Sequence, residues 1–312
     1  MTWIDPSRTG VRAAMHAWLG VLLLVNLSAC EEDVTAVVGT DLPYSLYGVL
    51  SPQLDSQWVR VYPIEGRLTP AEPEPIDAVV TSTNLTTGEQ IEWRDSIIVD
   101  FANQFAHVFW APFEAEFGHT YRIEARRSDG RSTHVDATVP PVSEIMIEPA
   151  QIRSDGVVLP VLISGDVPRV LRVEVDYAVV YRTIGAPNDV SDRVVIEYNT
   201  EPQEVEEGWR VPINLREDYE EVVATLVDRV DESIDSRVGI ILLNMTIRLI
   251  VGNQAWSPPN DVFDAEILVQ PGVMTNVESG FGFVGAGYRM SHLWIPPGEA
   301  AERAGFRPPS ES

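Results

Sequence analysis

Four histidines outside the N-terminal segment are the side chains of this sequence best suited to acid–base chemistry or metal binding, because imidazole titrates near neutral pH. They are His107, His119, His134 and His292, and no two stand at the spacing of metal ligands. The sequence contains no G-x-S-x-G nucleophile motif. His107 and His119 flank segments with strand-like patterns, where a structural role is the simpler interpretation. We therefore predict no catalytic residue, no metal site and no cofactor, and we expect the protein not to be an enzyme.

Carboxylates are the other groups that could bind a metal, and Asp261, Asp264 and Glu266 offer the oxygen ligands that Ca²⁺ prefers. Their spacing does not match the loop of an EF-hand. Acidic residues are also so abundant, 47 of 312 residues, that close pairs arise by chance. The sequence therefore predicts neither a calcium site nor a pair of glycosidase carboxylates.

Six tryptophans could form a stacking platform for sugar rings, because an indole presents a flat apolar face with a polar edge. Packing in the core or at its rim is the stronger interpretation for most of them. Trp256 and Trp294 are the candidate ligand-stacking residues, since both lie in segments flanked by proline. The six are Trp58, Trp93, Trp110, Trp209, Trp256 and Trp294.

The N-terminal segment has the pattern of a secretory signal that ends in a cysteine for lipid attachment. Arg8 and Arg12 supply a positive region, and the apolar run 17–25 is too short to span a bilayer, which needs about 20 residues. Leu27-Ser-Ala-Cys30 resembles the lipobox of bacterial lipoproteins, in which the cysteine is acylated and the chain is cut before it. Cys30 is the only cysteine, so it cannot form an internal disulfide, and lipidation explains its presence.

The lipobox resemblance implies a location and a membrane partner. Residues 1–29 are then a signal peptide, and acyl chains on Cys30 hold the protein on a membrane without a transmembrane helix. Glu31 follows the cysteine, where an aspartate would favour retention at the inner membrane, so we expect the outer membrane. An ordinary signal peptide or an uncleaved anchor is the alternative.

The chain is strongly acidic. Its 22 basic residues are all arginine and stand against 47 acidic residues, giving a net charge of −25. Without residues 1–29, which contain Arg8, Arg12 and Asp5, 20 basic and 46 acidic residues remain, a net charge of about −26. Nucleic acids and anionic lipid surfaces are poor partners for such a chain. An acidic surface without lysine is typical of salt-loving bacteria, and GC-rich codon usage is the alternative explanation.

After a tether over residues 30–43, the segment 34–140 has the pattern of an immunoglobulin-like β-sandwich. Alternation predicts that Trp58, Arg60 and Tyr62 share one strand face. The motif 117–123 resembles the entry to a late strand of such sandwiches, in which the ring of Tyr121 is buried and its hydroxyl hydrogen-bonds across a corner. Tandem proline after residue 139 ends the domain. The expected strands are 44–50, 58–62, 78–85, 90–93, 106–110, 121–125 and 133–139.

A second β-rich domain is expected over residues 142–298, with one amphipathic helix over about 215–232. Asn214 is the expected N-cap, with Glu217 as its capping-box partner, and the acidic face that includes Asp218 is expected to be solvated. In the strand 280–288, glycine alternates with bulky residues, which indicates close backbone approach or a bend. Residues 299–312 are expected to form a flexible tail. The other expected strands are 157–163, 170–181, 193–198, 208–213, 238–251 and 262–269.

The layout resembles a family of uncharacterised envelope lipoproteins of diderm bacteria. The matching pieces are Cys30, Tyr121-Arg-Ile123, Ala137-Thr-Val-Pro140 and the aromatic–glycine segment 276–286. The resemblance covers most of the chain after Cys30 and implies an immunoglobulin-like domain followed by a second β-rich domain. Its motifs are structural, so it implies no catalytic residue. Some relatives occur beside outer-membrane uptake receptors, which makes such a receptor a candidate partner.

Three functional hypotheses follow from these observations. The first is a lipid-anchored, non-enzymatic interaction or accessory module that docks onto an uptake receptor or another envelope protein. The second is a surface glycan-binding lipoprotein that assists nutrient uptake; an exposed aromatic row on one domain would favour it, and tryptophans buried in the core would count against it. The third is an enzyme, which a histidine beside a buried carboxylate in a cleft would favour.

Overall fold

The computed structural model describes residues 41–64, 74–99, 105–154, 156–198, 202–230, 233–257 and 275–308. The predicted signal peptide, Cys30, most of the tether and the carboxylates of segment 261–266 lie outside the described residues, as does the strand expected over 262–269. Within them the fold is mainly β, as predicted, with two α-helices. Neither helix is long and apolar enough to cross a membrane.

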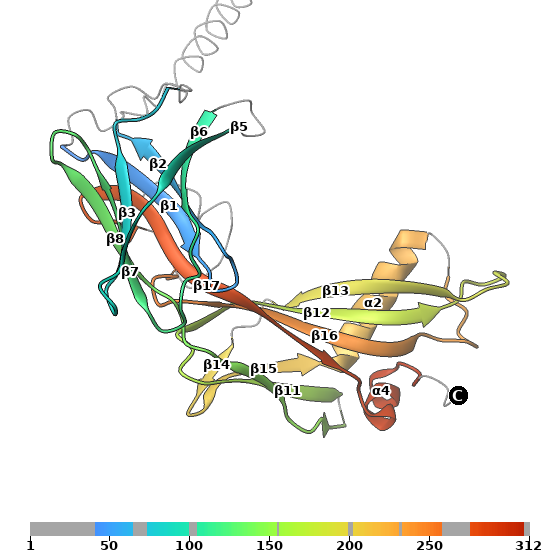
Figure 1. Cartoon of the computed structure of the whole chain (residues 1–312). Coiled ribbons are helices and arrows are strands. Elements are labelled where there is room, and N and C mark those ends of the chain that lie inside the picture. Colours follow the sequence, from blue (N-terminus) through green and yellow to red (C-terminus); the bar gives the residue numbers. More distant parts are fainter. Residues whose placement is uncertain are drawn as a thin grey trace, which may run out of the picture. The chain divides into compact units, whose positions relative to one another are not determined.

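The strands follow the sequence patterns closely (Figure 1). All seven strands predicted for the first half are present, and β5 is an eighth that the sequence did not predict. The first half contains β1 (Tyr44–Leu50), β2 (Gln57–Pro63), β3 (Val79–Asn84), β4 (Gln90–Glu92), β5 (Arg94–Val99), β6 (Phe105–Ala111), β7 (Thr120–Arg126) and β8 (Ser132–Thr138). The remainder contains β9 (Glu144–Ile147), β10 (Gln151–Ile152), β11 (Val157–Ser164), β12 (Arg169–Tyr181), β13 (Val190–Tyr198), β14 (Gln203–Val205), β15 (Gly208–Asn214), α2 (Leu215–Val230), β16 (Ile241–Gly252), β17 (Gly280–Trp294) and α4 (Gly298–Ala304).

The first half is a sandwich of two sheet faces around one core. Strands β1, β2, β6 and β5 lie in a large sheet, and β4-β3-β7-β8 form the second sheet. Side chains alternate along each strand, so that Val59 and Val61 are buried while Trp58 is exposed on the opposite face. The core is built from such inward-facing residues, including Leu46, Val61, Phe109, Ile123 and Val135.

A tyrosine fixes the corner before β7, as the sequence predicted. The Tyr121 ring is buried, and its hydroxyl accepts a hydrogen bond from the backbone N–H of Glu116 at 2.9 Å. The side chain of Asn84 lies beside the same hydroxyl. This arrangement matches the tyrosine corner of immunoglobulin-like sandwiches, in which the hydroxyl bonds the backbone a few residues upstream.

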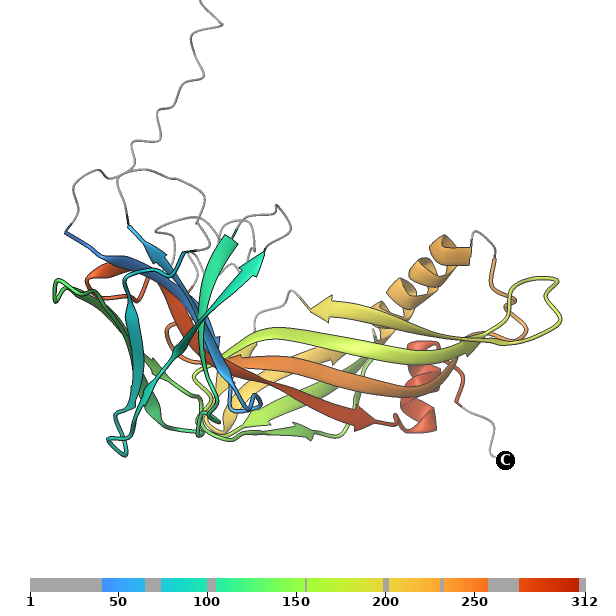
Figure 2. The same cartoon turned by 45° about the horizontal axis from the view of Figure 1, so that its top comes forward.

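Strand β17 belongs to both halves of the molecule. Residues 280–286 pair in parallel with β1, and residues 287–294 pair antiparallel with β16. The result is one eight-stranded sheet in the order β13-β12-β16-β17-β1-β2-β6-β5 (Figure 2). Val284 and Ala286 therefore complete the first core, although the sequence placed this strand in a separate domain over 142–298.

The glycines of β17 allow neighbouring groups to approach closely, as their alternation predicted. Gly282 has φ +106°, and a Cβ at this position would lie 2.1 Å from the carbonyl oxygen of Leu46. A Cβ at Gly285 would lie 2.6 Å from the indole nitrogen of Trp256. Neither position has room for a side chain, so these residues must be glycine for β17 to pair with β1 and to accept the Trp256 ring.

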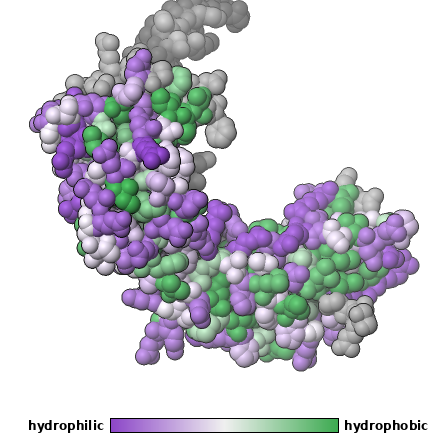
Figure 3. All heavy atoms as spheres, viewed as in Figure 1, coloured by the Kyte–Doolittle hydropathy of each residue, from purple (hydrophilic) through white to green (hydrophobic). Residues whose placement is uncertain are grey.

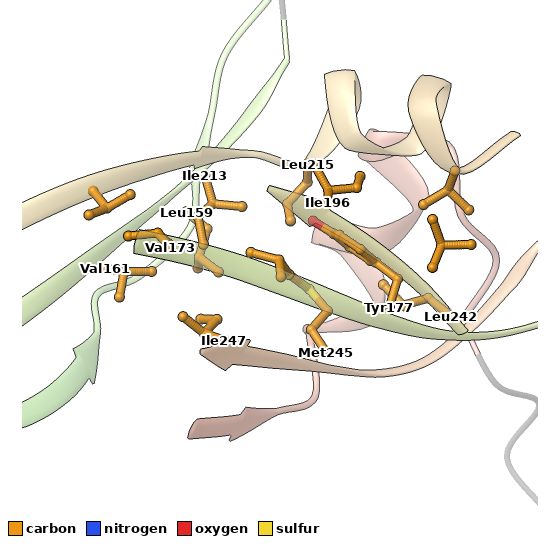
Figure 4. Close-up of a cluster of buried hydrophobic side chains, with 14 of the residues drawn as sticks. Leu159, Val161, Val173, Tyr177, Ile196, Ile213, Leu215, Leu242, Met245 and Ile247 are labelled. Carbon is orange, nitrogen blue, oxygen red and sulfur yellow. The ribbon is translucent and has the colours of Figure 1, made fainter. Parts of the chain in front are cut away.

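The second core lies between the other end of the large sheet and a smaller sheet formed by β9, β10, β11, β15 and β14. Figure 4 shows its side chains, among them Leu159, Tyr177, Leu215 and Met245. Helix α2 covers part of this core with the predicted apolar stripe, of which Leu215, Val222 and Leu226 are fully buried. The predicted N-cap is present, because the Asn214 side-chain oxygen accepts the backbone N–H of Arg216 at 3.2 Å.

The C-terminal segment differs from the flexible tail expected over residues 299–312. Residues 298–304 form helix α4, whose three alanines are buried, and the helix ends at Gly305 with φ +115°. Phe306 is 2 % exposed and stacks on Tyr177 with 5.8 Å between ring centroids. The apolar content of the segment is only a few alanines and one phenylalanine, so the sequence pattern gave a weak signal for packing.

Candidate functional site

The outer face of the large sheet carries a cluster of aromatic side chains in the first half of the molecule. The register of the strands places them together, because residues paired across adjacent strands point to the same side of a sheet. Tyr47 pairs with Phe283 on β17 and with Arg60 on β2, and Trp58 pairs with Trp110 on β6. We name this surface the aromatic face; its aromatic residues are Tyr47, Trp58, Tyr62, Trp110, Trp256 and Phe283.

The rings of the aromatic face contact one another in pairs. Trp58 and Trp110 stack with 6.0 Å between centroids, Tyr47 and Tyr62 meet edge to face at 6.4 Å, and Trp256 meets Phe283 edge to face at 4.8 Å. Offset and edge-to-face arrangements are the favourable geometries for aromatic pairs. The contacts therefore hold the rings in place across four strands and leave part of their surface to solvent.

Two members of the aromatic face are unusually exposed for their type. Trp58 is 46 % exposed and Tyr47 is 38 % exposed. Trp110, Tyr62, Phe283 and Trp256 are half-buried. Figure 3 shows hydrophobic residues interspersed with hydrophilic ones over the visible strands of the first half, where no single apolar patch dominates. Large exposed rings on a regular sheet are available to stack against a ligand.

Two arginines stand among these rings. The guanidinium of Arg60 lies 4.9 Å from the centroid of Tyr62, and that of Arg94 lies 5.3 Å from the centroid of Trp110. Arg60 also donates a hydrogen bond to the Tyr62 hydroxyl. These distances are within the range of cation–π interactions, which orient the guanidinium on the ring.

A buried glutamine positions the strand ends on which Trp58 and Trp110 lie. Gln57 is fully buried; its side-chain oxygen accepts the backbone N–H of Ser51 at 2.9 Å. Its amide nitrogen lies within 3.2 Å of the carbonyl oxygens of Ser51, Leu54 and Phe113. These contacts tie the β1–β2 connection to the segment after β6, and thereby fix the register of the two stacked indoles.

The two tryptophans predicted from the sequence to stack against a ligand, Trp256 and Trp294, lie on opposite faces of the large sheet. Trp256 lies on the aromatic face, where its indole N–H donates to the carbonyl of Ala286 at 3.2 Å and its ring covers Gly285. Trp294 is half-buried against the second core, on the inner face of the sheet. Of the remaining tryptophans, Trp93 is buried in the first core and Trp209 packs against the second.

Three of the four histidines are held by local polar contacts, while His292 lies half-buried on β17. His107 is 2 % exposed, and its Nδ1 lies 3.1 Å from both carboxylate oxygens of Asp95. His119 Nδ1 lies 3.0 Å from the Asn84 amide, and His134 Nε2 lies 3.1 Å from Glu278. Among the described residues, no three His, Cys, Asp or Glu side chains gather as a metal site would require. The His107–Asp95 pair is too deeply buried on the histidine side for a substrate to reach the ring.

Asp218 is a buried carboxylate that the sequence placed on the solvated face of the helix, and that expectation is wrong. It is 4 % exposed, and the hydroxyls of Tyr177 and Tyr198 both donate to its Oδ2. Burial raises its pKa to about 6, against the two tyrosine hydrogen bonds, while Glu221 and Glu217 raise it further. Residue 218 lies three positions after Leu215 and four before Val222, and this spacing was the available signal that it faces the core.

Comparisons with known proteins show no relative for this chain by sequence. No protein-family model matches it, and no curated protein is detectably similar. Similar solved structures include a pullulanase from Anoxybacillus sp. LM18-11, with 8 % identity over 66 % of this chain and 24 % of that chain, at a TM-score of 0.21. Another is the C-terminal globular domain of an oligosaccharyltransferase from Pyrococcus abyssi, with 12 % identity over 66 % of this chain and 46 % of that chain, at a TM-score of 0.22. This chain thus spans less than half of either structure, and such TM-scores do not show a shared overall fold.

Proposed function

We propose that this protein is a non-enzymatic binding protein of the bacterial cell envelope, anchored by lipid at Cys30, that binds polysaccharide through the aromatic face. The observation that supports polysaccharide as the ligand is the exposure of Trp58 and Tyr47 within an ordered row of rings. The sequence alone ranked a protein-docking module first, and an exposed aromatic row is the feature that favours the glycan-binding hypothesis over it.

The chemistry of a sugar ring fits this surface. A sugar presents apolar C–H faces and a polar rim of hydroxyls, and an indole or phenol ring is likewise apolar on its face and polar at one edge. The rings are spread over β17, β1, β2 and β6, and neighbouring strands lie about 4.8 Å apart. A row of this width suits several linked sugars better than a single one. Binding of this kind needs no reaction centre.

A protein partner is the second candidate, as the sequence analysis proposed with an outer-membrane uptake receptor in mind. Apolar side chains extend the aromatic face, namely Val49, Ile98 and Phe281, which are 43 %, 42 % and 36 % exposed. Tryptophan, tyrosine and arginine are also the residues enriched at the centres of protein interfaces. These features favour a docking surface if no polysaccharide binds.

A substitution on the aromatic face tests the proposed function. Trp58→Ala removes the most exposed ring, and we expect it to weaken binding to the best polysaccharide of a broad panel by about tenfold or more, equivalent to about 1.4 kcal/mol. Isothermal titration calorimetry on the purified protein measures this. Leu85→Ala is the matched control, because Leu85 is also 46 % exposed but lies beyond β3 of the other sheet, and it should leave binding unchanged. Equal affinities for wild type and Trp58→Ala, or no binding to any polysaccharide, would contradict the proposal.

The lipid anchor is tested separately. Cys30→Ser removes the thiol that the lipobox resemblance assigns to acylation, so the variant should incorporate no labelled palmitate and should be lost from the outer-membrane fraction. The measurement is palmitate labelling of cells followed by membrane fractionation. Equal labelling of wild type and variant would refute the anchor without bearing on the aromatic face.

A further inference from the structure

The two arginines of the aromatic face lie against aromatic rings rather than against acidic side chains. Within the described residues, neither Arg60 nor Arg94 forms an ion pair, and their guanidinium groups lie against aromatic rings instead. Two other arginines of the same sheet, Arg193 and Arg248, instead lie 2.8 and 2.6 Å from the buried carboxylate of Asp176. Among the described residues Arg153, Arg289, Arg303 and Arg307 likewise form no ion pair, so the feature that distinguishes Arg60 and Arg94 is their contact with the rings.

The rings hold these guanidinium groups in place but do not neutralise them. A cation–π contact orients the cation over the ring face, and the ring carries no net charge. The guanidinium of Arg60 is held by the Tyr62 ring and hydroxyl, while its Nε is buried without a hydrogen-bond partner. Arg94 is exposed beside Trp110. Both groups therefore remain cationic N–H donors beside the rings.

We propose that the aromatic face selects acidic polysaccharides, and that Arg60 and Arg94 bind the carboxylates of their uronate units while the rings stack against the sugars. This inference rests on the proposed function, since it names the ligand class for the same face. A planar guanidinium matches a carboxylate through two parallel hydrogen bonds, and such charge-assisted bonds are roughly twice as strong as neutral ones.

The placement of the two arginines points to a polymer. Arg94 lies on β5 and Arg60 on β2, with β6 between them, so the two positions are separated by two strand spacings, about 10 Å across the sheet. They also differ by one row along the strands, because Arg94 pairs with Trp110 whereas Arg60 pairs with Val108. This separation of the strand positions suits a chain that crosses the stacked indoles Trp58 and Trp110 better than it suits a single uronate.

The net charge of the molecule does not prevent this binding at physiological salt. The screening length is about 8 Å at 0.15 M ionic strength, so repulsion between a polyanion and distant acidic residues is largely screened. Contacts at the two arginines act within a few ångströms and are screened much less. The charges of Arg60 and Arg94 at the aromatic face, rather than the net charge of the molecule, therefore determine whether acidic or neutral polysaccharides are preferred.

The test compares one polymer backbone with and without its charge. Lipidated full-length protein in detergent is titrated at 0.15 M NaCl with polygalacturonate and with fully methyl-esterified polygalacturonate of the same length. We expect the wild type to bind the acid form at least about tenfold more tightly. Arg60→Gln/Arg94→Gln should remove this preference while still binding the ester. Arg153→Gln/Arg303→Gln removes the same two charges away from the face and should keep the preference, which controls for net charge.

The outcomes separate this inference from the proposed function. If the wild type binds the acid and the ester equally, or if the Arg60→Gln/Arg94→Gln variant keeps the preference, the inference is overturned and polysaccharide binding stands. If neither polymer nor any neutral polysaccharide binds, the proposed function itself fails. Dextran sulfate is the third arm: binding as tight as that of polygalacturonate, and insensitive to Trp58→Ala, would show general attraction of polyanions and would overturn the assignment to uronates. A melting temperature for each variant confirms that it is folded.

Discussion

The carboxylate of Asp218 joins a helix to a sheet, and the free energy required to bury it in its charged form makes stability depend on pH. Its carboxylate lies in the first turn of α2 and accepts hydrogen bonds from Tyr177 on β12 and Tyr198 on β13. The two bonds tie three elements together, and hydrogen bonds to a charged group contribute about 1.5–3 kcal/mol each. Desolvation opposes the charged form more strongly, so the pKa in the folded protein rises to about 6.

The raised pKa of Asp218 predicts a loss of stability as pH increases. In the unfolded chain the carboxyl has an ordinary pKa near 3.8, so between about pH 4 and 6 the folded state binds more protons than the unfolded state. Stability from this group is therefore fully present below the unfolded pKa and is lost as pH rises through 6, a difference of about 3 kcal/mol. Asp218→Asn cannot titrate at this position, so its free energy of unfolding should not show this loss. The difference in free energy of unfolding between the variant and wild type should therefore shift in favour of the variant by about 3 kcal/mol from pH 4 to pH 7.

Denaturant unfolding at several pH values measures this difference. Asp228→Asn is the matched control, since Asp228 lies on the same helix but is exposed, and its difference from wild type should change much less over the same range than that of Asp218→Asn. Parallel pH curves for wild type and Asp218→Asn would show that the carboxylate is not destabilised by burial.

Residue-level prediction from the sequence worked where one residue type dictates one geometry. Tyr121 and Asn214 were identified correctly because a tyrosine corner and a helix cap each need a specific side chain at a specific position. Asp218 was assigned to the solvent-exposed face because it is charged, although its spacing from Leu215 and Val222 places it toward the core. Its burial depends on the hydroxyls of Tyr177 and Tyr198, which lie on two strands distant in the sequence.

At the scale of elements, β17 shows how glycine makes a strand pairing possible. The carbonyl of Leu46 occupies the space that a side chain at position 282 would need, and the backbone there adopts a positive φ. Asn276 supports the same strand, since its side-chain amide exchanges two hydrogen bonds with the backbone of Val284, at 2.8 and 3.0 Å. Without these features β17 could not lie beside β1, and Phe283 would not reach the aromatic face.

Gly282→Ala should therefore destabilise the protein substantially. The substitution adds a clash with the Leu46 carbonyl to the strain of a positive φ, which alone costs about 1–2 kcal/mol for a residue with a Cβ. Gly88→Ala isolates the strain, because Gly88 has φ +80° but no atom lies within 4 Å of the position that its Cβ would take. The melting temperature of Gly282→Ala should fall clearly below that of Gly88→Ala. Equal melting temperatures would mean that β17 can shift away from β1 at little cost.

The sequence predicted strands better than it predicted their order. Alternation located Trp58, Arg60 and Tyr62 on one face, and the register confirms it. Strand β5 was missed because it follows β4 after a single residue, Trp93, at which the chain passes from one sheet to the other. That Trp110, Phe283 and Trp256 join the same face depends on which strands become neighbours, and local patterns do not contain this information.

At the scale of the whole molecule, negative charge is spread over both halves while arginine is used mainly in pairs. The exposed side of α2 carries Glu217, Glu220, Glu221 and Asp228, and only Glu220 has a partner on the helix, Arg216 at 3.1 Å. A net charge of −25 opposes the compact state through self-repulsion. Surface ion pairs contribute little against it, since exposed pairs are worth about 0–1 kcal/mol each.

Salt should consequently stabilise the folded protein. The screening length falls from about 8 Å at 0.15 M to about 3 Å at 1 M, which removes most repulsion between exposed carboxylates. We expect the melting temperature to rise steadily from 0.05 M to 1 M NaCl. Glu221→Gln/Asp228→Asn tests the cause, because it removes two unpaired exposed charges: it should melt above wild type at 0.05 M NaCl and at the same temperature in 1 M. A wild-type melting temperature that stays flat or falls with salt would show that repulsion among the acidic residues does not limit stability.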